Sequence, residues 1–424
     1  MQLRFAGPGW RPPGCGRGSA GGHRFFWSRV VSLCGMHFSQ AVSIIQSQVG
    51  TIRGVQVLYS DQNPLAVDLV INMPQDGIRL VFDPVAQRLK TIEIYNMKLV
   101  KLRYSGLCFN SPEITPSIEQ VEHCFGATHP GLYDSTRHLF ALNFRGLSFY
   151  FPVDTKFEPG YAHGLGSLQF PDGGSPVVAR TTIYPGSQHK PGAAAASAPA
   201  APAAPDLPLA CYGHELQLRR CDVLRSGGAT LGLRLHVCAG GARGPSSRRP
   251  LVRFGDSCQA VARALAAPAR LYYKADDKMR IHRPTARRRP PPASDYFFNY
   301  FTLGLDVLFD ARTHRVKKFV LHTNYPGHYN FNMYHRCEFR LAAAAVTVTA
   351  YSRWEAVSRA LRVCERPVVL NRASSTNTTN PFGSTFCYGY QDIIFEVMSN
   401  NHIASVTLYQ PEGARAHAAA DAGA

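Results

Sequence analysis

The sequence is poor in charged residues and in long apolar runs. Only 17% of its 424 residues are Asp, Glu, Lys or Arg, against about 25% in a typical globular chain, and this composition argues against wholesale disorder. No stretch of about 18 uncharged apolar residues occurs, so a membrane-spanning helix is not expected. The 36 glycines and 30 prolines interrupt the chain too often for a coiled coil. The sequence therefore predicts a soluble globular protein with more than one domain.

Motifs that mark common catalytic and metal sites are also missing. There is no P-loop, no G-x-S-x-G elbow, no H-E-x-x-H and no glycine-rich dinucleotide fingerprint. The 11 cysteines are scattered and odd in number, with no C-x-x-C and no zinc-ligand spacing. We therefore expect no cofactor, no metal and no enzymatic activity. Cysteines that stay reduced indicate a cytoplasmic protein.

The net charge of +18 is concentrated in two stretches. Residues 1–34 contain five arginines and no acid, and residues 241–293 contain 13 Lys or Arg against three Asp. The second stretch could bind phosphoinositide headgroups or RNA. The alternative is a basic loop rich in Ala, Arg and Pro that has no ligand, and we expect no nucleic acid as a partner. The arginines that would carry lipid binding are Arg248, Arg249, Arg287, Arg288 and Arg289.

Several stretches have the composition of loops, linkers or tails. Residues 1–35 show no helix or strand periodicity and are expected to be disordered, or not to be the natural start of the protein. Residues 186–207 are rich in Ala and Pro and are expected to link two folded lobes. Residues 413–424 are expected to form a disordered tail. The stretches 241–250 and 284–293 are expected to be basic insertions in the second lobe.

Internal repetition is the most informative feature of the sequence. The segment GIRLVFD at 77–83 matches GLDVLFD at 304–310, and each is followed at equal spacing by a second alternating segment. Two alternating strands joined by a short polar turn are the pattern of a β-hairpin. Four hairpins are predicted, at 77–94, 145–170, 304–321 and 390–408, of which the second is the most divergent and has its second strand at 167–170.

A short amphipathic helix precedes each hairpin. Each begins at a Ser or Asp, whose side-chain oxygen can accept from a free backbone N–H of the first turn. One further strand pair lies between helix and hairpin, for example 55–59 with 69–72 and 270–273 with 296–302. The four helices are predicted at 39–48, 117–125, 256–266 and 352–361.

These elements predict an α+β fold of tandem repeats, each a helix followed by a four-stranded antiparallel sheet. A single sheet buries one face under its own helix and leaves the other face weakly protected, so we expect the four units to pair into two lobes. The first lobe would cover 36–185. The second would cover 208–412, with additional strands at 212–238 and 333–350.

Asp83 and Asp310 recur at matching positions of the first and third hairpins. Paired carboxylates could serve as general acid and base in a hydrolase or transferase. An aspartate at a strand end more commonly accepts hydrogen bonds from the turn that follows. Catalysis would require a deep polar pocket around one of them, and exposed positions in turns would argue against it.

Longer stretches of the chain, at 55–68, 125–149, 295–331 and 380–409, carry a resemblance to a known family. From about Met36 to Tyr409 the sequence resembles the phagosome assembly factor family. The resemblance implies a non-enzymatic role in autophagy, in a complex with a WD40 β-propeller protein of the breast-carcinoma-amplified-sequence type. It also implies recruitment of that complex to the forming phagophore, with phosphoinositide binding mainly by the propeller.

Aromatic residues in loops are our candidates for contact with such a propeller, because aromatic anchors dominate the energetics of protein interfaces. The alternative function is direct binding of phosphoinositides or acidic membranes through the arginine-rich loops. The predicted partner contacts are Tyr133, Tyr325, Tyr329, Phe331 and Tyr334.

Overall fold

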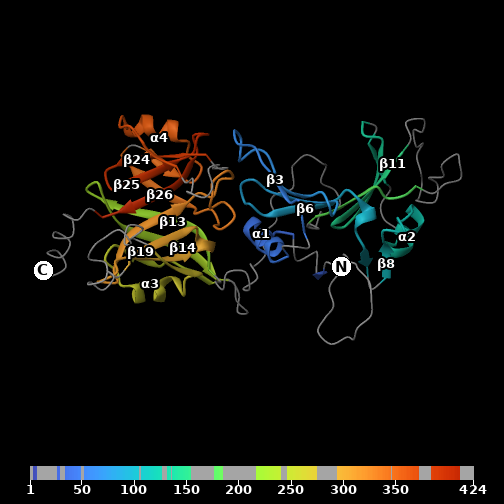
Figure 1. Ribbon diagram of the computed structural model, residues 1–424, viewed down its shortest axis with the longest axis horizontal. Coiled ribbons are helices and arrows are strands. Elements are labelled where there is room, and N and C mark those ends of the chain that lie inside the picture. The colour runs from blue at the N-terminus through green and yellow to red at the C-terminus, as the bar shows by residue number, and fades with distance from the viewer. Residues whose placement is uncertain are drawn as a thin grey trace, which may run out of the picture. The chain divides into compact units, whose positions relative to one another are not determined.

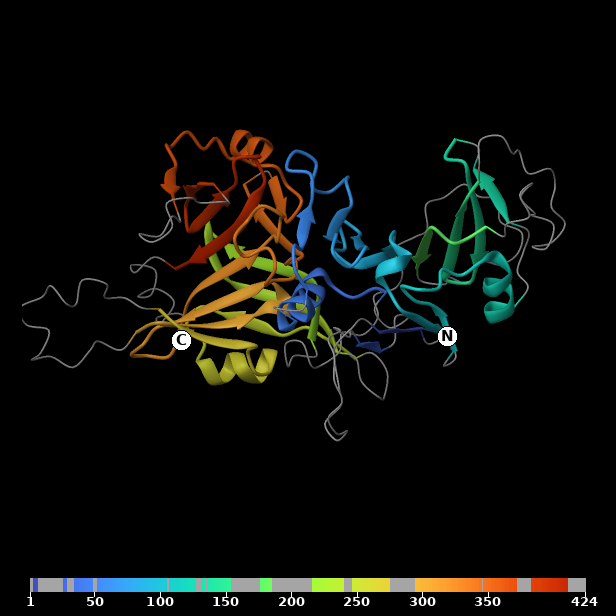
Figure 2. The same cartoon turned by 45° about the vertical axis from the view of Figure 1, so that its right-hand side comes forward.

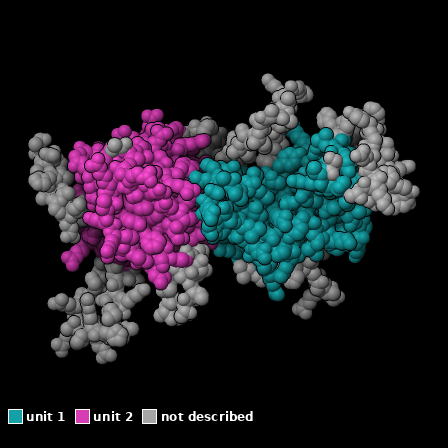
Figure 3. Space-filling view, turned by 90° about the horizontal axis from the view of Figure 1, so that it is seen from above, with its two compact units in different colours: residues 1–205 teal, residues 206–424 magenta. Residues whose placement is uncertain are grey.

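The computed structural model of the protein divides into two compact units, residues 1–205 and 206–424 (Figures 1 and 3). Antiparallel sheets and four α-helices make up most of the part described, as expected for an α+β fold. No helix in that part is long and apolar enough to cross a membrane. The residues described are 3–6, 26–28, 34–48, 52–104, 107–126, 131–134, 136–153, 176–184, 216–239, 246–274, 294–344, 346–371 and 383–410.

The first unit is built on an eight-stranded sheet with the order β3-β4-β5-β6-β12-β11-β10-β9, in which all neighbours are antiparallel. Helix α1 (Phe38–Ser47) precedes its first four strands and α2 (Ile118–Phe125) precedes the other four. The strands are β3 (Gln56–Leu58), β4 (Leu69–Met73), β5 (Ile78–Phe82), β6 (Leu89–Ile94), β9 (Leu132–Asp134), β10 (Leu139–Phe144), β11 (Leu147–Pro152) and β12 (Arg180–Ile183).

A smaller sheet in the first unit has the order β2-β1-β7-β8. Two of its strands come from residues 1–35. The strands are β1 (Leu3–Ala6), β2 (Phe26–Ser28), β7 (Leu102–Tyr104) and β8 (Leu107–Asn110).

The second unit contains an eight-stranded antiparallel sheet with the corresponding order, β17-β18-β19-β20-β26-β25-β24-β23. Helix α3 (Cys258–Leu265) precedes its first four strands and α4 (Trp354–Leu361) precedes the other four, at opposite ends of the strand array (Figures 1 and 2). The strands are β17 (Arg270–Tyr273), β18 (Tyr296–Tyr300), β19 (Leu305–Phe309), β20 (Val316–His322), β23 (Val368–Leu370), β24 (Thr385–Tyr390), β25 (Ile393–Val397) and β26 (Ile403–Tyr409).

A third sheet, in the second unit, has the order β15-β14-β13-β21-β22, with β16 also paired to β14. Its β13–β21 pair is parallel, whereas its other pairs are antiparallel. The strands are β13 (Leu216–Ser226), β14 (Ala229–Ala239), β15 (Ser246–Arg248), β16 (Leu251–Arg253), β21 (Phe339–Ala343) and β22 (Val346–Thr349).

All four predicted helices are confirmed, but three of the predicted caps are wrong. Ser117 caps α2 as expected. His37 caps α1, where its ring nitrogen accepts from a backbone N–H of the first turn. Ser257 caps α3, because Asp256 instead accepts from an upstream backbone N–H. Arg353 precedes α4 without a side-chain cap.

Three predicted hairpins are confirmed as β5–β6, β19–β20 and β25–β26. In the remaining hairpin β11 pairs with β12 at 180–183, so the partner strand predicted at 167–170 is wrong. A long connection joins β11 to β12 in place of a short turn. Sequence spacing therefore does not indicate which segment pairs with β11. The segment 167–170 itself lies outside the described residues.

The two large sheets differ in how their faces are covered. All five residues of β19 are buried, and Leu305, Val307 and Phe309 join α3, α4 and the third sheet in one apolar core. In β5 burial alternates, as in a sheet with one solvated face. That open face carries an ion pair, Arg180 to Glu93 at 3.0 Å.

Candidate protein-interaction surface

Three of the five aromatic residues predicted to contact a partner lie in the core of the second unit. Tyr325 is 0% exposed, Tyr334 4% and Phe331 9%. They belong to the segment 322–337, in which Tyr334 contacts Asp306 of β19 and Tyr325 contacts Ala350 and His402. Because a buried ring offers no surface to another protein, these three side chains are assigned to the core and not to a contact surface.

Tyr334 belongs to a buried hydrogen-bond network centred on Asp306 of β19. The Asp306 carboxylate accepts from the Tyr334 hydroxyl at 2.8 Å and from the Asn299 amide at 2.8 Å, and it lies 2.8 Å from Nε2 of His322. The Tyr334 ring stacks on His322 with centroids 3.8 Å apart. Burial, and then the charge of Asp306, raise the pKa of Tyr334 far above its usual value. Since both carboxylate oxygens have partners, the network fixes segment 322–337 to the sheet.

The other two predicted contacts are accessible. Tyr329 is 38% exposed, with its ring beside His328. Tyr133 is half-buried in β9, and its hydroxyl lies 3.3 Å from Nδ1 of His138. Both therefore remain candidates for contact with a partner, although the structure does not bring them together with the buried three.

The predicted lipid-binding arginines are only partly placed. Arg248 ends β15 and Arg249 follows it, and both side chains are exposed. No ion pair involves either of them within the described residues. Arg287, Arg288 and Arg289 lie outside the described residues, as do the linker at 186–207 and the tail at 413–424.

Asp83 and Asp310 both lie in turns. Asp83 accepts from the Val85 N–H at 3.0 Å, and Asp310 accepts from the Thr313 N–H at 2.9 Å. These turn bonds and Lys317, 3.2 Å away, hold the pKa of Asp310 far below its usual value. The pKa of Lys317 is raised, chiefly by its hydrogen bond to Asp295. A carboxylate held ionised beside a lysine held protonated fits a turn-stabilising role.

Apolar side chains are exposed along the outer strands of both eight-stranded sheets. The edges are β3 and β9 in the first unit and β17 and β23 in the second. Every residue of β3, β17 and β23 is exposed, whereas an edge strand that lies flat on a core buries alternate residues. We use the name edge-strand surface for these four strands, which are separate from one another and lie at opposite ends of the two sheets. Its exposed apolar residues are Val57, Leu58, Leu132, Leu271, Tyr272, Tyr273, Val368, Val369 and Leu370.

The edge-strand surface is suited to binding another chain. An edge strand presents a row of backbone N–H and C=O groups that can pair with an added strand, and its apolar side chains can pack against that strand. Protein sheets normally protect such edges with charge, proline or a covering element. Sequence reasoning predicted β3 and β17 as strands, but their position at the sheet edges follows only from the pairing order. The sequence does contain a weak indication of edge position. These strands are apolar at consecutive positions, whereas half-buried strands typically alternate apolar and polar residues.

Comparisons with known proteins agree with the resemblance in the sequence. The family model described as phagosome assembly factor 1 matches residues 30–409. A PHAF1 protein of Drosophila melanogaster is 58% identical over 402 residues, which cover 88% of this chain and 90% of that protein. A PHAF1 protein of Arabidopsis thaliana is 37% identical over 388 residues, covering 89% of each chain. One of Caenorhabditis elegans is 34% identical over 398 residues, covering 90% of this chain and 91% of that protein. No solved structure shows significant similarity. The chain belongs to the phagosome assembly factor 1 family.

Proposed function

We propose that this chain is a non-enzymatic interaction protein of phagosome assembly and autophagy. In this proposal it binds a WD40 β-propeller protein of the breast-carcinoma-amplified-sequence type in the cytoplasm, and the complex is recruited to the forming phagophore. Family membership supports the role in assembly. The edge-strand surface is the observation that carries the binding role, because it offers exposed apolar strands and open backbone groups. No group of three or more His, Cys, Asp or Glu suited to a metal occurs among the described residues.

We also propose that the two units are each a lobe of two copies of one motif, a helix followed by four strands. The matching strand orders support this. An isolated β-bridge that recurs in all four copies also supports the repeat. In each copy, the residue just before the helix pairs with a residue just before the fourth strand that follows that helix. The bridges are His37 to Arg88, Ser117 to Val177, Ser257 to Arg315 and Arg353 to His402.

Charged substitutions on the edge-strand surface are expected to weaken co-purification with the propeller. The variants are Leu58→Glu in β3, Tyr272→Glu in β17 and Val369→Glu in β23, each at an exposed position. At least one should reduce the recovered propeller about tenfold or more, because a buried charge in place of an apolar anchor costs at least about 1.4 kcal/mol. Arg359→Glu on the exposed face of α4 is the matched control. Full recovery with all three folded variants would argue against β3, β17 and β23 as the binding surface.

Direct binding to anionic membranes is the second candidate. Exposed Arg248 and Arg249 favour it, since clustered basic side chains near an anionic surface contribute about 1 kcal/mol each. The stretch 284–293 adds Arg287, Arg288 and Arg289 in the sequence.

Replacing Arg248 and Arg249 together with alanine is expected to lower binding to phosphoinositide vesicles about tenfold or more, if the membrane role is correct. Vesicle sedimentation measures this at low and high salt, and wild-type binding should fall as the salt rises. Deletion of 284–289 tests the second basic stretch in the same assay. Wild-type binding that is insensitive to salt and to both changes would rule out this role for the arginines.

A further inference from the structure

Strand β17 stands out among the four edges, because it combines aromatic side chains with basic surroundings. Leu271, Tyr272 and Tyr273 are 45%, 47% and 61% exposed. Arg270 lies with its guanidinium carbon 5.8 Å from the centre of the Tyr272 ring. Aromatic residues and arginine are the residue types most enriched among energetic anchors of protein interfaces.

The outward-facing backbone groups of β17 can be assigned from its pairing with β18. The N–H of Lys274 donates to the carbonyl of Asp295 at 2.9 Å, which makes Lys274 and Asp295 a hydrogen-bonded pair. Along antiparallel strands, hydrogen-bonded pairs alternate with pairs whose two residues make no backbone hydrogen bonds to each other. Tyr272 and Arg270 therefore bond toward β18, and Leu271 and Tyr273 direct their N–H and C=O groups away from it. Within the described residues β17 is the last strand on this side of the sheet.

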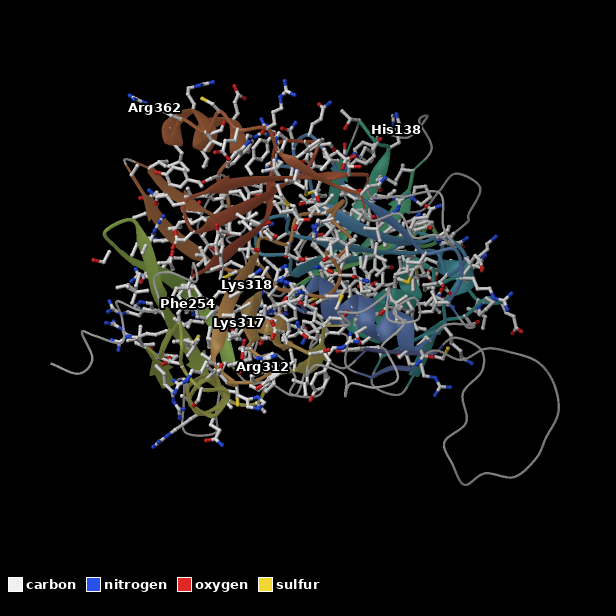
Figure 4. The ribbon with its side chains drawn as sticks, turned by 60° about the vertical axis from the view of Figure 1, so that its left-hand side comes forward. His138, Phe254, Arg312, Lys317, Lys318 and Arg362 are labelled. Carbon is white, nitrogen blue, oxygen red and sulfur yellow. The ribbon has the colours of Figure 1, made fainter. Side chains whose placement is uncertain are left out.

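The surroundings of β17 are positively charged. The turn between β19 and β20 lies at the same end of the sheet as Tyr273 but two strands away, since Tyr273 pairs with Tyr296 and Tyr296 with Phe309. Arg312 in that turn is exposed, and Figure 4 shows it in the same part of the unit as Lys317 and Lys318. The two nearby carboxylates, Asp295 and Asp310, both contact Lys317, at 3.0 and 3.2 Å.

Basic residues flank β17, with exposed Arg270 at its start and exposed Lys274 after its end, and the sequence that follows, which lies outside the described residues, is also basic. Residues 275–293 contain six Lys or Arg against two Asp. An acidic segment is therefore complementary to this edge, whereas a basic one is not. The same charge disfavours a second copy of the chain, because antiparallel self-pairing centred on Tyr272 would place Arg270 opposite Lys274, and like charges opposite each other destabilise a strand pair.

We propose that β17 is a strand-docking site for an extended, acidic peptide segment of a partner protein. The segment adds to the sheet as a new outer strand, with backbone hydrogen bonds to Leu271 and Tyr273. Because side chains alternate between the two faces of a strand, its apolar side chains pack on the face of Leu271 and Tyr273, and its carboxylates lie on the face of Arg270 and Lys274. This rests on and deepens the proposed function, because it names the edge and the kind of sequence that the partner supplies.

The full chain with synthetic peptides tests the site. The probes are a peptide in which valine alternates with glutamate, a second in which lysine replaces glutamate, and a third in which alternate residues of the acidic peptide are N-methylated. Fluorescence anisotropy should show binding of the acidic peptide that is at least about tenfold tighter than that of the other two. Equal binding of the lysine peptide would contradict the charge preference, and absence of acidic-peptide binding would overturn the proposal.

Leu271→Pro is the matching variant of the chain. It removes one outward N–H without removing a hydrogen bond to β18, so the unit should fold as before. Acidic-peptide binding is expected to weaken about tenfold. Leu271→Ala keeps the N–H and should retain most of the binding. Equal binding by the wild type and a folded Leu271→Pro variant would overturn the proposal.

Two other ligands of β17, a lipid membrane and a second copy of the chain, would give different results in these assays. Vesicles with phosphatidylinositol phosphates that bind the wild type and Leu271→Pro equally, while no peptide binds, would assign the basic residues to a lipid surface. Self-association of the chain that is lost in Leu271→Pro would assign β17 to a second copy. Either result overturns the proposal.

If the propeller still co-purifies while the acidic peptide does not bind, the proposed function stands and β17 is not its site. Failure of the wild-type chain to retain the propeller contradicts the proposed function itself.

Discussion

Replacing Tyr325 with alanine is expected to lower the free energy of unfolding of the second unit by about 3–5 kcal/mol. The ring is fully buried and lies 4.4 Å from the ring of His402, measured between centroids. The hydroxyl donates to the carbonyl of Ala350 at 3.0 Å, and the guanidinium of Arg336 lies 5.1 Å from the ring centre. Truncation would leave a cavity and remove a donor from a buried carbonyl, and both effects destabilise the fold.

Tyr329→Ala is the matched control, because it removes the same side chain from an exposed position four residues away. We expect its free energy of unfolding to stay within about 0.5 kcal/mol of the wild type. Urea unfolding of both variants measures the difference, and co-purification with the propeller separates stability from binding. A Tyr325→Ala variant that is as stable as the wild type but loses the propeller would return Tyr325 to the contact surface.

Raising the pH above 10 is expected to destabilise the second unit steeply. Burial raises the pKa of Tyr300, Tyr325 and Tyr334 above the ordinary value of 10.0, so the fold keeps these phenols neutral while the unfolded chain ionises them. The stability that they contribute is therefore present below pH 10 and is lost as the pH rises toward the folded-state pKa values. Each buried phenol costs about 1.4 kcal/mol per pH unit in that range.

Tyrosinate absorbance and denaturant unfolding, measured together across the alkaline range, test this expectation. The buried tyrosines should ionise only as the second unit unfolds, in one cooperative step. Tyr300→Phe should reduce the dependence of stability on pH by about 1.4 kcal/mol per unit. Gradual ionisation of these groups near pH 10 in a chain that remains folded would show that they are accessible to water.

Local patterns were enough to predict much of the fold. The hairpins at 77–94 and 304–321 and the helices that precede them were identified because alternation and helical spacing are properties of neighbouring residues. The helix N-caps were harder to predict. His37, which caps α1, is not among the usual capping residues. The partner of β11 was missed because a long connection hides β12 from any spacing argument.

The contact surface could not be predicted in the same way. Tyr325, Tyr329 and Tyr334 are the same residue type in one loop, and only the fold decides that the first and last are buried while Tyr329 remains exposed. Asp306 gives the clearest example, because its partners come from β18, β20 and the segment that follows β20. Which strands lie at the sheet edges also depends on pairing between segments that are far apart in the sequence.

Hydrogen exchange of the full chain, alone and with the purified WD40 propeller, tests the central claim most directly. Backbone pairing with an added strand should slow exchange at one or more of β3, β9, β17 and β23, while exchange at the buried residues Tyr325 and Tyr334 stays unchanged. A complex that forms with no slowing at any of these strands, and with protection only elsewhere, would contradict the account.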